Sequence, residues 1–400
     1  TTAKVSLVQD NEPAISQGYF VGGAARGHPV MYPVVDIVEV GAGGGSIAWI
    51  DEVGALKVGP RSAGGHPGPV CYGQGGTEAT VTDANVILGR LVADRFLGGE
   101  MPLDVEAART AIHDQIATPL DMTVEQAALG IIDIAIAEMS LAVRSVSVGR
   151  GYDPRDFAMV GFGGAGPLHA GQIARELGIP SLIIPRVPGH FSALGMLLAN
   201  LRHDYVRTYY KPLDACDFTE IGAAFDTMIE EARGVLEEEG ATPDRINYQR
   251  FLDIRYIGQE FPILTPVSAE DIASGDVAAL RATFDRIHDR RYGHQAVNEP
   301  VEVVNLRLTG TGEREHLSFP GIAGTAGEAL IDSRPVIFND PAKPVVSPIY
   351  DRDRLAAGEV VVGPAAVVEY ASTTVLFAGD SLEVAPSGEL IIVIAQGEMA

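Results

Sequence analysis

Basic residues and cysteines are scarce in this sequence, and long apolar runs are missing. Its 400 residues include 29 Lys and Arg against 53 Asp and Glu, which gives a formal net charge of −24. This balance disfavours nucleic acid as a partner, because proteins that follow a phosphate backbone need basic surface to release counterions. The apolar segments stay short of the roughly 18 uninterrupted residues of a membrane helix, so no membrane span is predicted.

The two cysteines, Cys71 and Cys216, are too few for a disulfide framework and lack the CxxC spacing of a thiolate zinc site. This scarcity predicts a reducing, cytoplasmic location. His66 and Cys71 flank a Pro-Gly-Pro segment and are open to interpretation as a metal or nucleophile pair. Their spacing matches no strong ligand pattern, which favours a structural role.

The length and texture of the chain predict an α/β protein of two or three domains. The first, residues 1–212, has short β-branched runs at 4–9 and 34–40, a helical insertion at about 84–150, and a strand–helix–strand unit at 157–185. Thr123 and Gln126 have capping-box spacing before a long apolar helix, predicted to be buried. An α+β domain at 213–315 and a small β-rich module at 316–400 follow.

A glycine-rich segment, VEVGAGGGSIAWID, lies between two predicted strands and holds Gly41, Gly43, Gly44, Gly45 and Ser46. Without Cβ atoms in the way, backbone N–H groups of such a loop approach an anion closely. A strand follows the glycines, so the segment is neither a P-loop nor a dinucleotide fingerprint. We interpret it as a β-hairpin phosphate clamp, with a tight hairpin that binds nothing as the alternative.

The second glycine cluster, GFGGAGPLHA, contains Gly163, Gly164 and Gly166 after a strand and at the start of a helix. A helix N-terminus suits an anion or nucleotide, because its free N–H groups and dipole favour negative charge. Close strand–helix packing also needs glycine and is the alternative. A third feature, Thr1, Thr2 and Lys4, offers two hydroxyls and an ammonium to phosphate and a bound magnesium ion.

Together these three pieces resemble the nucleotide-binding signature of the superfamily of acetate and sugar kinases, chaperone ATPases and actin. The stretches GAGGGSIAWIDEVGALKVGPRSAGGHPGPVCYG, RGYDPRDFAMVGFGGAGPLHA, PGHFSALGMLLANLRHDY and FLDIRYIGQEFPI resemble the hydantoinase A/5-oxoprolinase family. This resemblance spans nearly all of the chain. It implies an actin-like, sugar-kinase-type (ribonuclease-H-like) ATPase lobe over residues 1–212. The family pattern places an acidic residue and two glycines before a Thr-Thr pair, so we expect the family's amino-terminal region to be missing here.

The resemblance also implies a chemistry. The family includes subunits of N-methylhydantoinase, 5-oxoprolinase, and acetone and acetophenone carboxylases. We therefore expect an ATP-dependent hydrolase subunit that opens a cyclic amide through phosphorylation of its carbonyl oxygen, with a ketone carboxylase subunit as the alternative. The implied cofactors are ATP and Mg²⁺ or another divalent metal, and the implied partner is a hydantoinase B-type subunit in a hetero-oligomer.

By the same resemblance, the ATP-binding residues are expected to be Thr1, Thr2, Lys4, Gly43, Gly44, Gly45, Ser46, Gly163, Gly164 and Gly166. Asp83 is the favoured catalytic residue, for a metal-bound water or the substrate, and Asp36 is the second choice. A helix-cap role for Asp83 is an equally open alternative. No metal ligand set is identified. Core or salt-bridge roles are expected for His169, Asp253 and Arg255.

Two other classes remain open at this point. The chain begins with Thr1, and an amino-terminal threonine acts as nucleophile and base in self-processed hydrolases. An ATP-gated scaffold without substrate chemistry would use the same phosphate clamp. Nucleotide binding without turnover would identify the scaffold, whereas a free, mature Thr1 amine would indicate the hydrolase.

Overall fold

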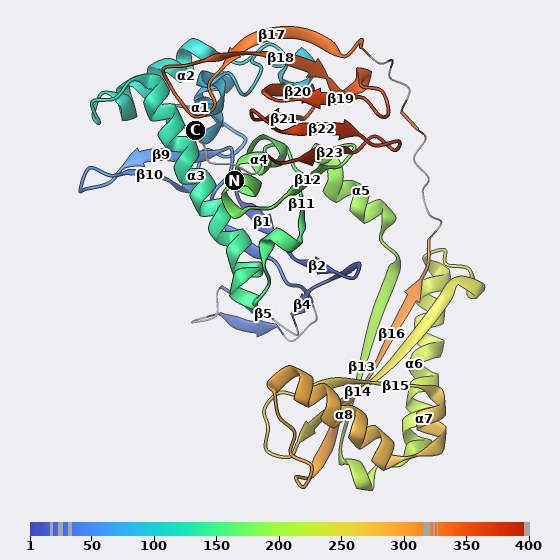
Figure 1. The fold of residues 1–400 in the computed structure, drawn as a ribbon. Coiled ribbons are helices and arrows are strands. Elements are labelled where there is room, and N and C mark those ends of the chain that lie inside the picture. Colours follow the sequence, from blue (N-terminus) through green and yellow to red (C-terminus); the bar gives the residue numbers. More distant parts are fainter. Residues whose placement is uncertain are drawn as a thin grey trace. The chain divides into compact units, whose positions relative to one another are not determined.

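A computed structural model describes residues 1–16, 19–22, 27–30, 34–314, 321–322, 325 and 327–395. The fold is mixed α/β (Figure 1). It divides into two compact units, the first made of residues 1–193 and 319–400 and the second of residues 194–318. Each unit is described by itself.

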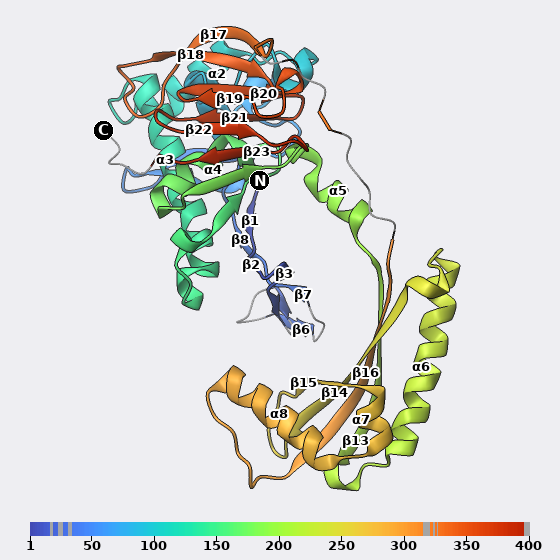
Figure 2. The ribbon, with the colours of Figure 1, turned by 45° about the vertical axis from the view of Figure 1, so that its right-hand side comes forward.

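The first unit opens with a narrow antiparallel ribbon. The strand β1 (Ala3–Val5) pairs with β8 (Val38–Val40), and each lies largely within one of the β-branched runs predicted at 4–9 and 34–40. Three further short ladders lie between them in sequence: β2 (Val8–Gln9) with β3 (Glu12–Pro13), β4 (Ile15–Ser16) with β7 (Val34–Val35), and β5 (Tyr19–Val21) with β6 (His28–Val30). Figure 2 shows the ribbon leading away from the helices of this unit. After the glycine loop, β9 (Ser46–Ile50) and β10 (Leu56–Ser62) form an antiparallel hairpin.

The helical insertion predicted at about 84–150 consists of α1 (Val81–Ile87), α2 (Val105–Ile112), which continues as a π-helical turn (His113–Ala117), and α3 (Val124–Val146). The predicted capping box of Thr123 and Gln126 is present at the start of α3. This helix is long and apolar enough to cross a membrane by length and composition alone. Because ten of its side chains are buried in the core, it has the character of a core helix, as predicted.

The central sheet of the first unit joins distant parts of the chain. The strands β11 (Ala158–Val160) and β12 (Ser181–Ile184) are parallel, with α4 (Gly166–Leu177) between them in sequence. The sheet continues with β23 (Leu390–Val393), β22 (Ser381–Val384) and β19 (Val360–Val362). A second sheet contains β17 (Leu330–Val336), β18 (Val345–Asp351), β20 (Ala365–Glu369) and β21 (Ser372–Leu376), and α4 packs on β21. The carboxy-terminal strands therefore differ from the separate module expected at 316–400, because β23 completes the sheet of β12.

The second unit follows α5 (Phe191–Leu198), which contains the division between the units. It has a four-stranded antiparallel sheet in the order β13 (Leu201–Pro212), β16 (Val301–Gly312), β14 (Ile246–Tyr256) and β15 (Ile263–Val267). Its helices are α6 (Phe218–Glu238), α7 (Ala269–Ser274) and α8 (Val277–Tyr292). Since β13 pairs with β16 along most of its length, this unit begins before the expected boundary at residue 212.

Candidate functional site

The glycine loop between β8 and β9 is held from inside by Ser46. The backbone N–H of Gly43 donates to Ser46 Oγ at 2.9 Å, and this hydroxyl donates to the carbonyl of Gly41 at 3.3 Å. Ser46 is fully buried. Its side chain thus shapes the loop instead of facing a ligand, and the phosphate contact expected of its hydroxyl is not supported by this geometry.

Gly44 and Gly45, both partly exposed, carry open N–H donors of this loop. The carbonyls of the peptide units to which they belong are engaged with protein: Gly43 O accepts from Ser46 N at 3.0 Å, and Gly44 O accepts from Thr82 N at 2.9 Å. In a trans peptide the N–H points opposite to the C=O. Both N–H groups therefore point away from those partners, and among the described residues neither has an acceptor.

Close neighbours explain why these positions are glycine. A Cβ added at Gly44 would lie 2.9 Å from Thr82 Oγ1, and one at Gly45 would lie 2.8 Å from Ser62 Oγ. The hydroxyl of Thr82 also donates to Gly44 O at 2.8 Å. Sequence reasoning missed Thr82 and Ser62, because both act through contacts distant in sequence and have no motif of their own.

Thr1 and Thr2 lie against the same loop, as predicted. A Cβ on Gly43 would be 3.0 Å from Thr1 N and 3.3 Å from Thr2 N. Ser62 Oγ donates to Thr1 Oγ1 at 3.2 Å. Lys4 differs from the prediction, because its ammonium pairs with Glu39 across the β1–β8 ladder at 3.1 Å. We therefore leave Lys4 out of the candidate site.

The second glycine cluster meets the first. The helix α4 begins at Gly166 with Ala165 as its N-cap residue, and no side chain caps it. The Cβ of Ala165 lies 3.7 Å from the position a Cβ would take on Gly44. The open N-terminus of α4 is thus adjacent to the loop that carries the open N–H groups of Gly44 and Gly45.

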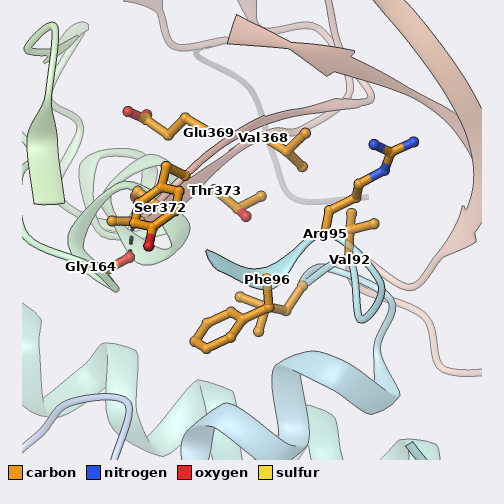
Figure 3. Close-up of a pocket in the computed structure, with 11 residues that line it drawn as sticks. Val92, Arg95, Phe96, Gly164, Val368, Glu369, Ser372 and Thr373 are labelled. Atoms are coloured by element: carbon orange, nitrogen blue, oxygen red, sulfur yellow. Dashed lines mark hydrogen bonds between the residues drawn. The ribbon is translucent and has the colours of Figure 1, made fainter. Parts of the chain in front are cut away.

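Turns from other elements hold Gly163 and Gly164 in place. Gly163 has a φ of +89° and donates its N–H to Pro188 O at 2.7 Å. Gly164 O accepts from Ser372 Oγ at 3.1 Å, as the dashed line in Figure 3 shows. The small pocket of Figure 3 lies beside Gly164, between the segment 91–96 and the β20–β21 turn. Its interior, about 20 Å³ for the centre of a water-sized sphere, holds about one water molecule, so we do not assign adenosine to it.

Asp83 has the helix-cap role that was the alternative to catalysis. One carboxylate oxygen accepts from Thr80 N at 2.8 Å and Thr80 Oγ1 at 2.7 Å, and the other from Cys71 N at 2.7 Å. A longer bond joins Val70 N at 3.3 Å. The side chain is fully buried. Asp83 therefore ties the start of α1 to the segment 70–72, and this geometry gives no support to its predicted catalytic role.

Asp36 is separated from the glycine loop by the whole of β8. Its carboxylate pairs with Arg150 at 2.6 Å, and its N–H donates to Ala14 O at 2.7 Å. The structure thus gives Asp36 a role in fixing the ribbon to the turn that follows α3. It does not bring Asp36 together with Asp83.

The remaining singled-out residues have structural environments. Cys71 is fully buried, and burial raises the pKa of its thiol far above the usual range, which leaves it protonated and inert. His66 is exposed, so the two do not form a pair. Asp253 pairs with Arg307 at 2.7 Å and Arg255 with Glu302 at 2.8 Å, as expected.

His169 lies in the first turns of α4 and is 2% exposed. Burial, and then the nearby charge of Arg90, lowers the pKa of its imidazole to about 4. Neither ring nitrogen has a hydrogen-bond partner among the described residues. A core role was expected for this residue, and the structure confirms its burial. In the same described part of the chain, no group of three or more His, Cys, Asp and Glu side chains is placed to hold a metal ion.

Comparison with protein-family models identifies the chain. The hydantoinase/oxoprolinase model matches residues 1–205, and the model of the hydantoinase/oxoprolinase C-terminal domain matches residues 213–385. The chain belongs to the hydantoinase/oxoprolinase family. The expected family is confirmed, and each glycine cluster lies within the matched range of the first model.

Individual relatives agree with this assignment. An uncharacterised protein of Methanocaldococcus jannaschii is 41% identical over 94% of this chain and 55% of its own length. The caprolactamase subunit alpha of Pseudomonas jessenii is 39% identical over 86% of this chain and 50% of its own length. The chain thus spans about half the length of these relatives.

Two solved structures are similar in fold to this chain. The crystal structure of ATP-dependent caprolactamase from Pseudomonas jessenii matches with a TM-score of 0.74 and 36% identity, over 92% of this chain and 54% of that one. A nucleotide-free acetone carboxylase structure matches with a TM-score of 0.82 and 27% identity, over 99% of this chain and 57% of that one.

Proposed function

We propose that this chain is the ATP-binding part of an enzyme that opens a cyclic amide after phosphorylating its carbonyl oxygen. The observation that carries the proposal is the meeting of the two glycine clusters. The open N–H groups of Gly44 and Gly45 lie beside the uncapped N-terminus of α4, in a family whose solved relative is an ATP-dependent caprolactamase.

This arrangement suits the phosphates of a nucleotide. Backbone N–H groups at a glycine turn and at a helix N-terminus bind anions, because both carry partial positive charge that costs no side-chain ordering. In a chain with a net charge of −24, such fixed donors also replace the lysines that often bind phosphate. We assign Gly44, Gly45 and the start of α4 to the phosphates.

The backbone of Thr1 and Thr2 lies against Gly43, and Ser62, which approaches Gly45, donates to the Thr1 hydroxyl. We assign the hydroxyls of Thr1 and Thr2 to a hydrated Mg²⁺. Magnesium in phosphoryl-transfer sites keeps several waters and takes many of its ligands from the substrate phosphates. A site of this kind needs no cluster of protein carboxylates, which is consistent with the lack of such a cluster among the described residues. Mg²⁺ when bound would neutralise phosphate charge during transfer.

The chemistry follows from the weakness of an amide as an electrophile. Transfer of the terminal phosphoryl group of ATP to the amide oxygen releases ADP and turns that oxygen into a leaving group. Water then adds to the carbon, and the ring C–N bond breaks as the nitrogen takes a proton, which leaves an acyl phosphate. A second water hydrolyses this acyl phosphate to the carboxylate and free phosphate. The residues of this chain serve the first step by positioning and by electrostatic stabilisation, in what we further propose is an actin-like ATPase lobe.

A ketone carboxylase subunit is the second proposal, favoured by the match to acetone carboxylase over 99% of this chain. Both chemistries share the phosphorylation of a carbonyl-derived oxygen and differ in the attacking group. One named relative, the caprolactamase subunit alpha, is a subunit, so we also propose a hetero-oligomer with a hydantoinase B-type partner. The cytoplasm is the proposed location.

The deciding experiment is phosphate release by the full-length protein with its partner subunit, supplied in turn with 5-oxoproline, a hydantoin, caprolactam, or acetone with bicarbonate. Release stimulated by a cyclic amide supports ring opening, and release only with ketone and bicarbonate supports the carboxylase. ATP binding without turnover on any of them would identify a scaffold and refute both proposals.

A matched pair of glycine variants tests the site itself. Gly45→Ala introduces a Cβ 2.8 Å from Ser62 Oγ, so either the Ser62 side chain or the loop must shift beside the proposed phosphate site, and we expect ATP affinity to fall about tenfold. Gly234→Ala is the control, because a Cβ there meets nothing within 4 Å. Unchanged ATP affinity in folded Gly45→Ala protein would remove the loop from the nucleotide site.

A further inference from the structure

The carbonyl oxygen of Gly44 is held by Thr82, a residue that lies outside the glycine loop. The backbone N–H of Thr82 donates to this oxygen at 2.9 Å, and the Thr82 hydroxyl donates to it at 2.8 Å. Thr82 belongs to the first turn of α1 and is 38 residues away in sequence. One residue of another element therefore uses both lone pairs of this carbonyl.

These two bonds determine where the next N–H group points. Gly44 O and Gly45 N belong to the same peptide unit, and in a trans peptide the N–H is directed opposite to the C=O. Since the oxygen points to Thr82, the Gly45 N–H points away from it. Gly45 is partly exposed, and its N–H has no acceptor among the residues that the structure describes. Thr82 thus orients a donor that we assign to phosphate.

The opposite orientation of this peptide is also accessible to the backbone, because both of its residues are glycine. Rotation of a peptide plane changes ψ of the residue before it and φ of the residue after it, and glycine tolerates such changes. A rotated peptide would turn the Gly44 carbonyl, with its partial negative charge, toward the phosphates. It would also turn the N–H of Gly45 away from them. The loop would then repel the ligand that it is proposed to bind.

The preceding peptide is supported differently. In the described part of the chain, it is held from within the loop, where Gly43 O accepts from Ser46 N at 3.0 Å. The support of the Gly44–Gly45 peptide from α1 requires a close approach, because a Cβ added at Gly44 would lie 2.9 Å from Thr82 Oγ1. The Thr82 hydroxyl therefore packs directly against the loop whose second donor it orients.

We propose that Thr82 is a positioning residue of the phosphate site, whose hydroxyl keeps the Gly44–Gly45 peptide in the orientation that offers the Gly45 N–H to phosphate. The identity of the ligand rests on the proposed function, whereas the control of the peptide orientation does not. Thr82 acts through the Gly44 carbonyl and not by contact with the nucleotide. A donor that is oriented before the ligand arrives needs no reorganisation on binding.

Two substitutions separate the hydroxyl from the rest of the side chain. Thr82→Val removes the hydroxyl and keeps the shape of the side chain and the backbone N–H, whereas Thr82→Ser keeps the hydroxyl. Isothermal titration calorimetry of the full-length protein gives the affinities for ATP, inorganic tripolyphosphate and adenosine. We expect Thr82→Val to bind ATP and tripolyphosphate about five- to tenfold more weakly, and Thr82→Ser to bind both within about twofold of the parent protein. Adenosine affinity should not change, because adenosine carries no phosphate.

Thr227→Val is the matched control, because the Thr227 hydroxyl also donates to a backbone carbonyl, that of Ala223 on α6, at 2.9 Å. It should leave all three affinities unchanged. Thr82→Ala removes the same hydroxyl as Thr82→Val and carries the same expectation, so the test does not depend on the folding of one variant. Tripolyphosphate affinity equal to that of the parent protein in these two variants would overturn the proposal. An equal loss in Thr82→Ser, or an equal loss for adenosine, would also overturn it.

The peptide orientation is measured without nucleotide, so this inference and the proposed function can fail separately. In spectra of protein labelled with ¹⁵N at glycine, the Gly45 amide is the signal that Gly45→Ala removes. We expect one sharp Gly45 signal in the parent protein and a broadened or doubled one in Thr82→Val, because the peptide then samples both orientations. One sharp signal at the parent position in Thr82→Val would refute the role of Thr82. A parent protein that binds neither ATP nor tripolyphosphate would refute the proposed function, and the Gly45 signal would still decide on Thr82.

Discussion

Replacement of Asp83 by alanine separates a catalytic role from a structural one. The carboxylate accepts four hydrogen bonds, three of them at 2.7–2.8 Å, and it is fully buried. Asp83→Ala leaves the donors of Thr80, Cys71 and Val70 without an acceptor in the core. Each such buried donor costs about 1–3 kcal/mol. After partial relaxation we expect a loss of about 3–5 kcal/mol in the free energy of unfolding of the first unit.

The single tryptophan of the chain allows the loss of stability to be measured in the first unit, which contains Asp83. Trp49 lies on β9, where its indole N–H donates to Gly59 O at 2.8 Å. Urea unfolding followed by Trp49 fluorescence therefore reports the first unit. Asp104→Ala is the matched control, because Asp104 caps α2 through one bond of 2.9 Å to Ala107 N. We expect that variant to lose only about 1 kcal/mol.

ATP-dependent turnover of Asp83→Ala should be largely retained, in contrast to its stability. Folded Asp83→Ala protein, kept below its unfolding midpoint, should retain ATP-dependent activity within a few fold of the parent protein. A variant that unfolds like the parent, within about 1 kcal/mol, and that has lost all turnover would refute the structural reasoning. That outcome would restore Asp83 as a catalytic residue.

Three further predictions concern buried groups. Arg352→Met should lower the free energy of unfolding of the first unit by about 3–5 kcal/mol, because the largely buried Glu369 carboxylate would lose the guanidinium that pairs with it at 2.8 Å. Hydrogen exchange in the variant that stays slow around β20 would contradict this prediction. His169 has a folded pKa of about 4 against 6.5, so stability should be constant above pH 6.5 and fall by up to about 1.4 kcal/mol per unit between pH 6.5 and 4. Urea midpoints of His169→Gln should lack this slope, and identical slopes would refute the assignment. Ellman's reagent should reach Cys216 slowly and Cys71 only after unfolding, and rapid reaction of both thiols in native protein would contradict the buried environment of Cys71.

Local patterns allowed much of the first unit to be predicted. The capping box at Thr123 and the apolar spacing after it placed α3, and the glycine punctuation placed β11, α4 and β12 with boundaries within about two residues. These elements are specified by residues close in sequence. The meeting of Thr1 with the glycine loop was also expected, although from the family resemblance and not from spacing.

Non-local pairing accounts for what the sequence did not reveal. Glu39 forms an ion pair with Lys4 because the β1–β8 register places the two residues opposite each other. Ser46 turns inward because Gly41 and Gly43 offer backbone partners on the core side. The placement of β22 and β23 beside β12 depends on strand order, which a short apolar run with tight turns does not encode.

The position of β23 also has a consequence for how the protein folds during its synthesis. Ser181 of β12 pairs with Val393 of β23, which is synthesised roughly 200 residues later. At ordinary rates of translation, β12 therefore lacks this neighbouring strand for about 10–40 s. During that interval one edge of β12 is unpaired, although Leu182 and Ile184 are fully buried in the finished sheet. The second unit closes its own sheet within residues 201–312 and is complete first. We therefore expect chaperone binding and aggregation to compete for this chain during the interval in which the first unit is incomplete.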